Sequence, residues 1–375
     1  MMHKLGVRSL VALLRIGALV VPMDGLLAPA AHAQQAPTSQ TPTTVITCVS
    51  KPGERQVCKA DTAAGVALLR SIGDGNCLLG KNWGYDDAGV WVSDGCGGEF
   101  AVEEGMPRML DDRLPGIAEK RRELEAWPEK ARVEGWYAED DSTDLLLPAV
   151  PWDDPTWSAN EHSFNLLLRD YVKPGQRVLE VGAARCWGAL HMVPRGVDYV
   201  ATDILADPVI GLGRGEFYER HVGPFERVQA DGENLPFADG SFDLVYCVAS
   251  LHHALDARKM LKEMARVTRR GGVVAALNEG TRAPGASEDN PQQESEKSYG
   301  INEHVHTMWA YVAAFLAAGV AITRLEQAEG YDVIKQRRRL RHVLRVPLVG
   351  RTAATLLTQN LSEYSGITIV GRRLA

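Results

Sequence analysis

Three acidic residues that each close an apolar run are the first candidates for binding chemistry. Glu180 ends the run that begins at Arg177, Asp203 ends VDYVATD, and Asp231 follows ERVQA. A buried carboxylate is costly without a cationic or hydrogen-bonding partner, and it repels a neighbouring pyrophosphate. These residues therefore favour a positively charged ligand that carries no phosphate.

The loop GAARCWG, from Gly182 to Gly188, follows the first of these acids and keeps only its two terminal glycines. A dinucleotide loop needs more glycines so that its backbone can approach the pyrophosphate. S-adenosylmethionine has no phosphates and carries a positive amino group and a positive sulfur, so the single tight turn at Gly182 is enough. Asp203 lies where an acid for the ribose hydroxyls is expected, about 20 residues further on. Asp231 and the two residues after it suit the adenine.

Strand-like and helical runs alternate from residue 176 onward, and this alternation predicts the fold class. The helical run 256–268 has apolar side chains at helical spacing. Alternation of this kind predicts an α/β fold with a parallel sheet that is covered by helices on both faces. The strand-like runs are RVLEVGA, VDYVATDI, ERVQAD, FDLVYCVA and GGVVAALNEG.

A series of short motifs resembles the class I S-adenosylmethionine-dependent methyltransferases, in particular the group called type 11. The resemblance covers roughly residues 148–375. It implies a Rossmann-like, seven-stranded sheet whose last strand, SGITIVGRR at 365–373, runs antiparallel to the others. The motifs are EVG at 180–182, TD at 202–203, ADGENLPF at 230–237, SFDL at 241–244, SLHH at 250–253, and Glu263 to Val267 with the glycine pair 271–272.

This resemblance implies S-adenosylmethionine as the cofactor and methyl transfer as the reaction. One position departs from the family, which usually has glycine where Ala184 stands, and this puts the affinity for the cofactor in question. The residues that the resemblance places at the cofactor are Glu180, Gly182, Ala184, Asp203, Asp231, Gly232, Glu233 and Val248.

Two histidines are candidates for a catalytic base, although methyl transfer needs a base only when the acceptor arrives protonated. His253 follows the fourth strand, where the transferred methyl group is expected, and packing is the alternative role. His304 lies after the polar segment 281–299 and could line an acceptor pocket. We expect no metal site.

The first 147 residues divide into four segments. Residues 1–33 resemble a secretory signal peptide that ends in Ala-His-Ala, with a loose tail or a wrongly set start as the alternative. Residues 34–44 are rich in Pro, Thr and Gln and predict a flexible linker. Residues 45–104 predict a small β-domain with four cysteines, and residues 105–147 a helical connector.

Four cysteines in this small domain, behind an apparent signal peptide, predict a disulfide framework with an open pairing. They are Cys48, Cys58, Cys77 and Cys96. Zinc is the competing interpretation, but no C-x-x-C pair is present.

The elements RQVC, GNC and WGYDDAGVWVSDGCGGEF resemble a bacterial four-cysteine domain of unknown function, some members of which are described as lectin-like. Trp83, Tyr85 and Trp91 could then stack on a glycan, or they could belong to the core.

Charge constrains the partners. The net charge of −7 argues against a general nucleic-acid binder. The basic segment 335–351 has an apolar stripe beside its arginines, which suits a membrane surface, an anionic substrate or a solvated helix face.

Together these features predict a methyltransferase that acts on a small-molecule or cell-surface acceptor. The alternative is an exported surface- or glycan-binding protein with a silent methyltransferase fold. The leader-like segment and the clustered cysteines favour the periplasm or the exterior, whereas S-adenosylmethionine is made in the cytoplasm, and the sequence leaves this conflict open.

Overall fold

The computed structural model describes most of the chain beyond the predicted linker. The segment predicted as a signal peptide, nearly all of the predicted linker and residues 335–349 of the basic segment lie outside the described residues. Within the described part, no helix is both long enough and apolar enough to cross a membrane. The described residues are 44–330 and 350–374, without 61, 63–65, 76, 79–80, 87, 103–109, 111–115, 139–140 and 291–292.

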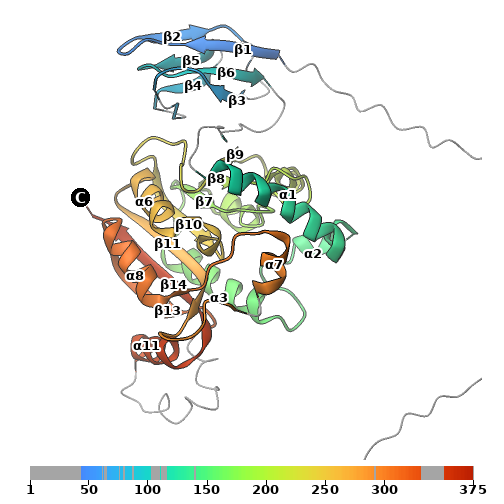
Figure 1. Ribbon diagram of the computed structural model, residues 1–375, viewed down its shortest axis with the longest axis vertical. Coiled ribbons are helices and arrows are strands. Elements are labelled where there is room, and N and C mark those ends of the chain that lie inside the picture. Colours follow the sequence, from blue (N-terminus) through green and yellow to red (C-terminus); the bar gives the residue numbers. More distant parts are fainter. Residues whose placement is uncertain are drawn as a thin grey trace, which may run out of the picture. The chain divides into compact units, whose positions relative to one another are not determined.

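The cysteine-containing segment folds into two three-stranded antiparallel sheets (Figure 1). Trp83 and Phe100 form its centre, with ring centroids 5.0 Å apart. One sheet has the order β1-β6-β3 and the other β2-β5-β4. The strands are β1 Thr44–Val49, β2 Arg55–Cys58, β3 Val66–Ser71, β4 Trp83–Asp86, β5 Gly89–Ser93 and β6 Gly97–Val102.

Two disulfides hold this small unit together, as the sequence predicted, and the structure supplies the pairing. Cys48 bonds to Cys58 and Cys77 to Cys96. A unit of this size buries little apolar surface, so covalent links supply stability that its core does not.

The aromatic residues considered for glycan stacking do not form an exposed platform. That role is wrong for Trp83, which is fully buried. Trp91 is half-buried, and the Arg55 guanidinium lies 4.3 Å from the centre of its ring. The structure therefore gives no support to a glycan-binding face built from these residues.

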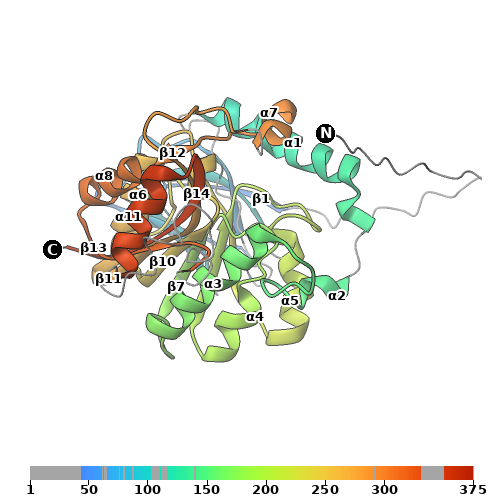
Figure 2. The same cartoon turned by 90° about the horizontal axis from the view of Figure 1, so that it is seen from below.

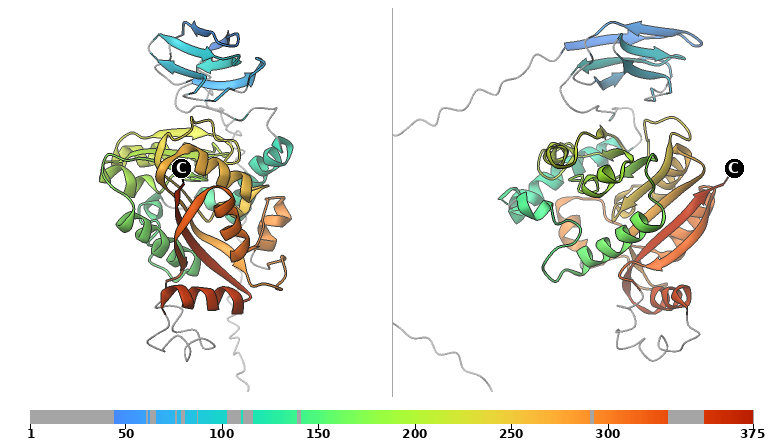
Figure 3. Two further views of the ribbon diagram at one scale, coloured as in Figure 1. Left: turned by 90° about the vertical axis from the view of Figure 1, so that its left-hand side faces the viewer. Right: turned by 180° about the vertical axis from the view of Figure 1, so that it is seen from behind.

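The second sheet has the predicted α/β topology. Its order is β13-β14-β11-β10-β7-β8-β9, with the two-residue β12 paired to β11. The neighbours β9, β8, β7, β10 and β11 run parallel, and β14 runs antiparallel to β11 and to β13 at one edge (Figure 3). The strands are β7 Arg177–Val181, β8 Asp198–Asp203, β9 Glu226–Gln229, β10 Phe242–Val248, β11 Thr268–Arg282, β12 His306–Thr307, β13 Val320–Gln327 and β14 Tyr364–Arg373.

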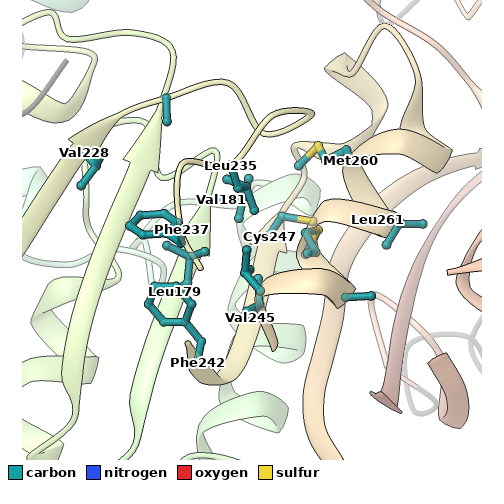
Figure 4. Packing of buried hydrophobic residues seen from close by; sticks show 14 of the residues in the cluster. Leu179, Val181, Val228, Leu235, Phe237, Phe242, Val245, Cys247, Met260 and Leu261 are labelled. Atoms are coloured by element: carbon teal, nitrogen blue, oxygen red, sulfur yellow. The ribbon is translucent and has the colours of Figure 1, made fainter. Parts of the chain in front are cut away.

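Helices cover both faces of this sheet (Figure 2). On one face α3 (Pro155–Asp170), α4 (Ala189–Met192) and α5 (Gly215–Val222) pack on the sheet. On the other face lie α6 (Ala257–Val267), α8 (Met308–Ala317) and α11 (Arg351–Leu361). Figure 4 shows Met260 and Leu261 of α6 beside the strand residues Val181, Val245 and Cys247.

Local sequence explains where these helices begin. The Asp154 side chain accepts the N–H groups of Thr156 and Trp157 at the start of α3. The Asp256 side chain likewise accepts N–H groups in the first turn of α6. Helix α6 ends at Val267, immediately before β11. Such N-terminal acceptors satisfy N–H groups that have no partner within the helix.

Within residues 105–147, the main helix is α1 (Ile117–Glu134). Short turns follow at Trp136–Ala138 and in α2 (Asp141–Asp144). α1 contacts α7 (Glu294–Tyr299), where the Lys130 Nζ lies 3.2 Å from a Glu296 oxygen. The connector therefore packs on the α/β fold.

We expect reduction to loosen the small β-unit and to leave the α/β fold intact. Loss of either disulfide should lower the unfolding free energy of the unit by about 2–4 kcal/mol. Hydrogen–deuterium exchange of the full chain with and without dithiothreitol measures this locally, and peptide mapping checks the pairing. Buried Cys186 and Cys247 serve as the control, because native alkylation should modify neither thiol. A peptide linking Cys48 to Cys77 or Cys96 would contradict the assignment.

Candidate functional site

A cavity of about 690 Å³ opens at the carboxyl ends of the central parallel strands. Val181 and Gly182 line it at the end of β7, Asp203 at the end of β8, and Val248 at the end of β10. Ligands of open α/β sheets bind at this edge, and the volume falls within the usual range for small-molecule pockets.

The loop after β7 turns tightly at Gly182, where φ is +74°. A Cβ at this position would lie 1.8 Å from the Ser250 Oγ, so only glycine fits. The N–H groups of Gly182 and Ala183 both donate to the Thr202 carbonyl, at 2.8 and 2.9 Å. These bonds tie the loop to the neighbouring strand β8.

Ala184, where the family has glycine, also takes a left-handed conformation with φ +43°. Its N–H donates to an Asp203 carboxylate oxygen at 2.8 Å, and it lines the cavity. Alanine adopts this left-handed conformation at some cost in energy. Alanine in place of the family's glycine therefore lowers stability, but the loop still makes its turn.

Glu180 lies outside the lining of the cavity and points to the opposite face of the sheet. The Tyr246 hydroxyl donates to its carboxylate at 2.7 Å, and the Tyr199 hydroxyl donates to the same oxygen. Burial is the main cause that raises the pKa of Glu180 to about 7. A Cβ at Gly188 would lie 2.3 Å from this carboxylate. The structure thus places this carboxyl against two phenols beside the loop, and direct contact of Glu180 with a charged ligand stays a prediction.

Asp203 lies in the wall of the cavity, at the position expected for an acid that binds ribose hydroxyls. Its two carboxylate oxygens accept the N–H groups of Ala184 and Leu205, each at 2.8 Å. Burial raises the pKa of Asp203, and these N–H groups act in the opposite direction. The bonds fix the carboxylate at the end of β8.

Asp231, Gly232 and Glu233 also line the cavity, after β9. A side chain at Gly232 would come within 2.9 Å of Val181, which explains the need for glycine there. The Lys120 ammonium of α1 lies 2.6 Å from an Asp231 oxygen and 2.8 Å from a Glu233 oxygen. Both carboxylates are thus held by a buried cation that the sequence analysis did not place at this site.

The two candidate histidines occupy different surroundings. His253 lines the cavity, and its Nδ1 lies 2.9 Å from the Asn302 carbonyl oxygen. Burial and the neighbouring His252 lower the pKa of His253 to about 3, so its ring is neutral and only weakly basic at physiological pH. His304 does not line this cavity, and its ring stacks on His306 with centroids 5.7 Å apart.

Helix α1 and nearby loops supply lining residues that sequence reasoning did not assign to the site. Glu123 and Trp127 come from α1, and Trp136 follows it. In the run LEAWPEKARVEGWY, aromatic residues interrupt a charged segment, and this could have indicated a binding role. The spacing of these residues, however, does not indicate that they lie near the strand ends. Trp187 also lines the cavity, as do Trp152 and Trp157. For the last two the sequence allowed either a cap on the cofactor cleft or hydrophobic packing.

Comparison with known proteins agrees with the predicted domain. Residues 179–276 match the family model described as "Methyltransferase domain". Residues 45–114 match a family described as "Protein of unknown function (DUF3011)", whose description mentions no lectin role. The chain therefore carries a methyltransferase domain preceded by a domain of unassigned role.

Individual relatives match over the same central region. The demethylmenaquinone methyltransferase of Corynebacterium glutamicum (strain R) is 37% identical over 101 residues, which are 27% of this chain and 40% of that protein. The cycloartenol-C-24-methyltransferase of Arabidopsis thaliana is 34% identical over 122 residues, 32% of this chain and 36% of that protein. The chain thus spans less than half the length of these relatives.

Among solved structures, the geranyl diphosphate C-methyltransferase of Streptomyces coelicolor A3(2) is similar with a TM-score of 0.47 and 13% identity. The match covers 70% of this chain and all of that one.

We expect Ala184→Gly to stabilise the fold, because glycine removes the cost of a left-handed alanine, by about 1 kcal/mol. Chemical denaturation of the full chain measures the change. The neighbouring Ala183→Gly is the control and should destabilise, because Ala183 is buried and does not have a positive φ. Equal effects of the two substitutions would show that backbone conformation is not the cause.

The raised pKa of Glu180 predicts a pH-dependent cost to the native state. The folded carboxyl holds its proton up to about pH 7, whereas the unfolded one releases it near pH 4.5, so stability falls as pH rises between these values. Glu180→Gln should remove this pH dependence. Its unfolding free energy should therefore rise by about 2–3 kcal/mol relative to that of the wild type between pH 5 and pH 8. Exposed Glu216→Gln on α5 is the control, and a parallel pH profile for both variants would refute the assignment.

Proposed function

We propose that the chain is an S-adenosylmethionine-dependent methyltransferase that acts on a small-molecule acceptor. The observation that carries the proposal is the arrangement around the cavity: one tight glycine turn, and carboxylates after successive parallel strands. The match of residues 179–276 to a methyltransferase domain supports it.

The residues present fit such a cofactor. In this proposal Asp203 accepts hydrogen bonds from the ribose hydroxyls, and Asp231 with Gly232 borders the adenine. Gly232 matters because a side chain there would collide with Val181 and close this part of the cavity. When bound, the cofactor supplies an electrophilic methyl group on a positively charged sulfur.

The protein's own contribution is to bind, orient and exclude water. Apolar and aromatic side chains form much of the cavity wall, and the Asp203 carboxylate in that wall is fixed by the backbone N–H groups of Ala184 and Leu205. In an in-line displacement, holding nucleophile and methyl group in contact geometry supplies much of the rate. His253 is neutral and faces the cavity, so it orients an acceptor as a hydrogen-bond partner and does not act as a strong base.

A catalytically silent binding protein is the weaker alternative, because the cofactor side of the cavity keeps its glycine turn and its acids. A nicotinamide oxidoreductase is disfavoured because Ala184 and Arg185 line the place where a pyrophosphate needs bare backbone.

We also propose that the chain matures in an oxidising compartment, such as the periplasm or the exterior. The two disulfides of the small unit support this, since such bonds persist mainly outside the cytoplasm.

Isothermal titration of the full chain with S-adenosylhomocysteine, and separately with NAD, tests the function. Heat with the former alone is the expected result. Asp203→Asn should weaken binding of S-adenosylhomocysteine about 10–100-fold, because charge-assisted bonds to the ribose are lost. Asp198→Asn, at the exposed start of the same strand, is the control and should bind normally. No binding by folded wild-type protein would refute the proposal.

A further inference from the structure

One carboxylate in the wall of the cavity has no cationic partner of its own. Glu123, in the middle of α1, is only 5% exposed and lines the cavity. The indole of Trp127 donates a hydrogen bond to it. Among the described residues, no ion pair to the Glu123 carboxylate is found. A buried carboxylate in this situation is costly unless a proton or a cation joins it.

The charges that line the cavity do not balance. Two cations, Lys120 and Arg185, face five acidic residues. The Lys120 Nζ bonds to Asp231 and Glu233. Asp144 is paired twice: an Arg185 nitrogen lies 3.1 Å from one of its oxygens, and the Arg214 Nε, which is outside the lining, lies 2.7 Å from the other. The acidic residues are Glu123, Asp144, Asp203, Asp231 and Glu233.

The cofactor does not restore this balance. S-adenosylmethionine carries an ammonium, a sulfonium and a carboxylate, and so brings one net positive charge. With three cations (Lys120, Arg185 and the Arg214 that pairs with Asp144) against five acids, one negative charge remains at the cavity after the cofactor binds. The second ligand of the site is therefore favoured when it too is positively charged.

Aromatic rings stand next to Glu123 in the same wall. The rings of Trp127 and Trp136 have centroids 6.3 Å apart, and both residues line the cavity. Trp127 also contacts the ring of His253, edge-on at 5.7 Å. Tryptophan faces attract ammonium groups, and this attraction is strongest where water is excluded. The Lys130 ammonium already lies 4.5 Å from the centre of the Trp136 ring, so the ring offered to a ligand is that of Trp127. An acid beside this ring suits an organic cation.

We propose that the methyl acceptor is an amine that enters as an ammonium cation and is held by the Glu123 carboxylate and the Trp127 ring. This inference rests on the proposed function, and it names the substrate class of the same cavity. A neutral acceptor would leave the buried carboxylate without a counter-charge.

The transfer balances with these groups alone. The ammonium gives one proton to the Glu123 carboxylate, which frees the lone pair on nitrogen. That lone pair forms the new bond to the methyl carbon, and the carbon–sulfur bond breaks with its electron pair going to sulfur. The products are a methylated ammonium and neutral S-adenosylhomocysteine, and the carboxyl releases its proton to water.

Matched pairs of amines and alcohols test the proposal directly. The pairs are tryptamine with indole-3-ethanol, phenethylamine with 2-phenylethanol, and octylamine with 1-octanol. Each is titrated calorimetrically into the full chain saturated with S-adenosylhomocysteine at pH 8. At least one amine should bind ten times more tightly than its alcohol. If no amine exceeds its alcohol, or if nothing binds, the proposal is overturned.

Two variants on helix α1 distinguish a loss of amine binding from a loss of folding. Glu123→Gln should weaken the preferred amine about 10-fold, leave its alcohol unchanged, and keep the affinity for S-adenosylhomocysteine within 2-fold. Glu119→Gln, one turn earlier and exposed, is the matched control and should change neither. An unchanged amine affinity in Glu123→Gln overturns the proposal. If S-adenosylhomocysteine itself fails to bind the wild type, the proposed function fails, and the same pairs titrated without it still decide the amine preference.

The pH dependence gives a second readout. Burial and the nearby carboxylates of Asp203 and Glu303 raise the pKa of Glu123 to about 7, against the opposing effects of Trp127 and Lys120. Amine binding should therefore strengthen between pH 6 and pH 8, while the amines stay protonated. The profile of Glu123→Gln should be flat over this range, and a rise equal to that of the wild type would contradict the role of this carboxylate.

Discussion

A single buried carboxyl group holds the functional edge of the sheet together. Glu180 of β7 accepts hydroxyl groups from Tyr199 on β8 and Tyr246 on β10. The same carboxyl packs against the backbone at Gly188, where the loop becomes helix α4. It thereby links the three strands β7, β8 and β10, whose ends line the cavity, and it packs beside the loop.

This arrangement explains why a carboxyl group and two phenol hydroxyls lie within an otherwise apolar part of the sheet. A buried carboxyl must find donors, and only one relative placement of the three strands brings both phenols to one oxygen. On the cavity side, Asp203 repeats the principle with backbone donors from Ala184 and Leu205. The loop 182–188 lies between these two acids. It cannot shift without breaking the hydrogen bonds of Asp203 or the contacts of Glu180.

The sequence predicted the sheet well because its strands are apolar throughout and are punctuated by helices. The parallel core and the acids at the strand ends follow from that pattern, whereas the antiparallel last strand was implied by the resemblance to the methyltransferases. The orientation of Glu180 did not follow. Neighbouring strand residues point to opposite faces, but β7 is buried on both, so hydrophobicity gave no sign that Val181 and not Glu180 faces the cavity.

Other features depend on contacts between segments far apart in the chain. Lys120 meets Asp231 across 111 positions, and no local spacing encodes such a pair. The charged pattern of α1 reads as a solvated connector, yet Lys120 and Glu123 are buried against the cavity. The disulfide pairing is of the same kind, because four cysteines permit three pairings and only the strand arrangement selects one.

The two parts of the chain treat their cysteines differently. In the small unit, cysteines pair and replace a core that is too small. In the α/β fold, Cys186 and Cys247 are buried, and burial raises the pKa of both thiols well above the usual value. Because the thiolate is the reactive form, these cysteines resist oxidation without pairing. The α/β fold is therefore chemically compatible with the oxidising compartment that we propose, and in that proposal the remaining conflict concerns how the cofactor reaches it.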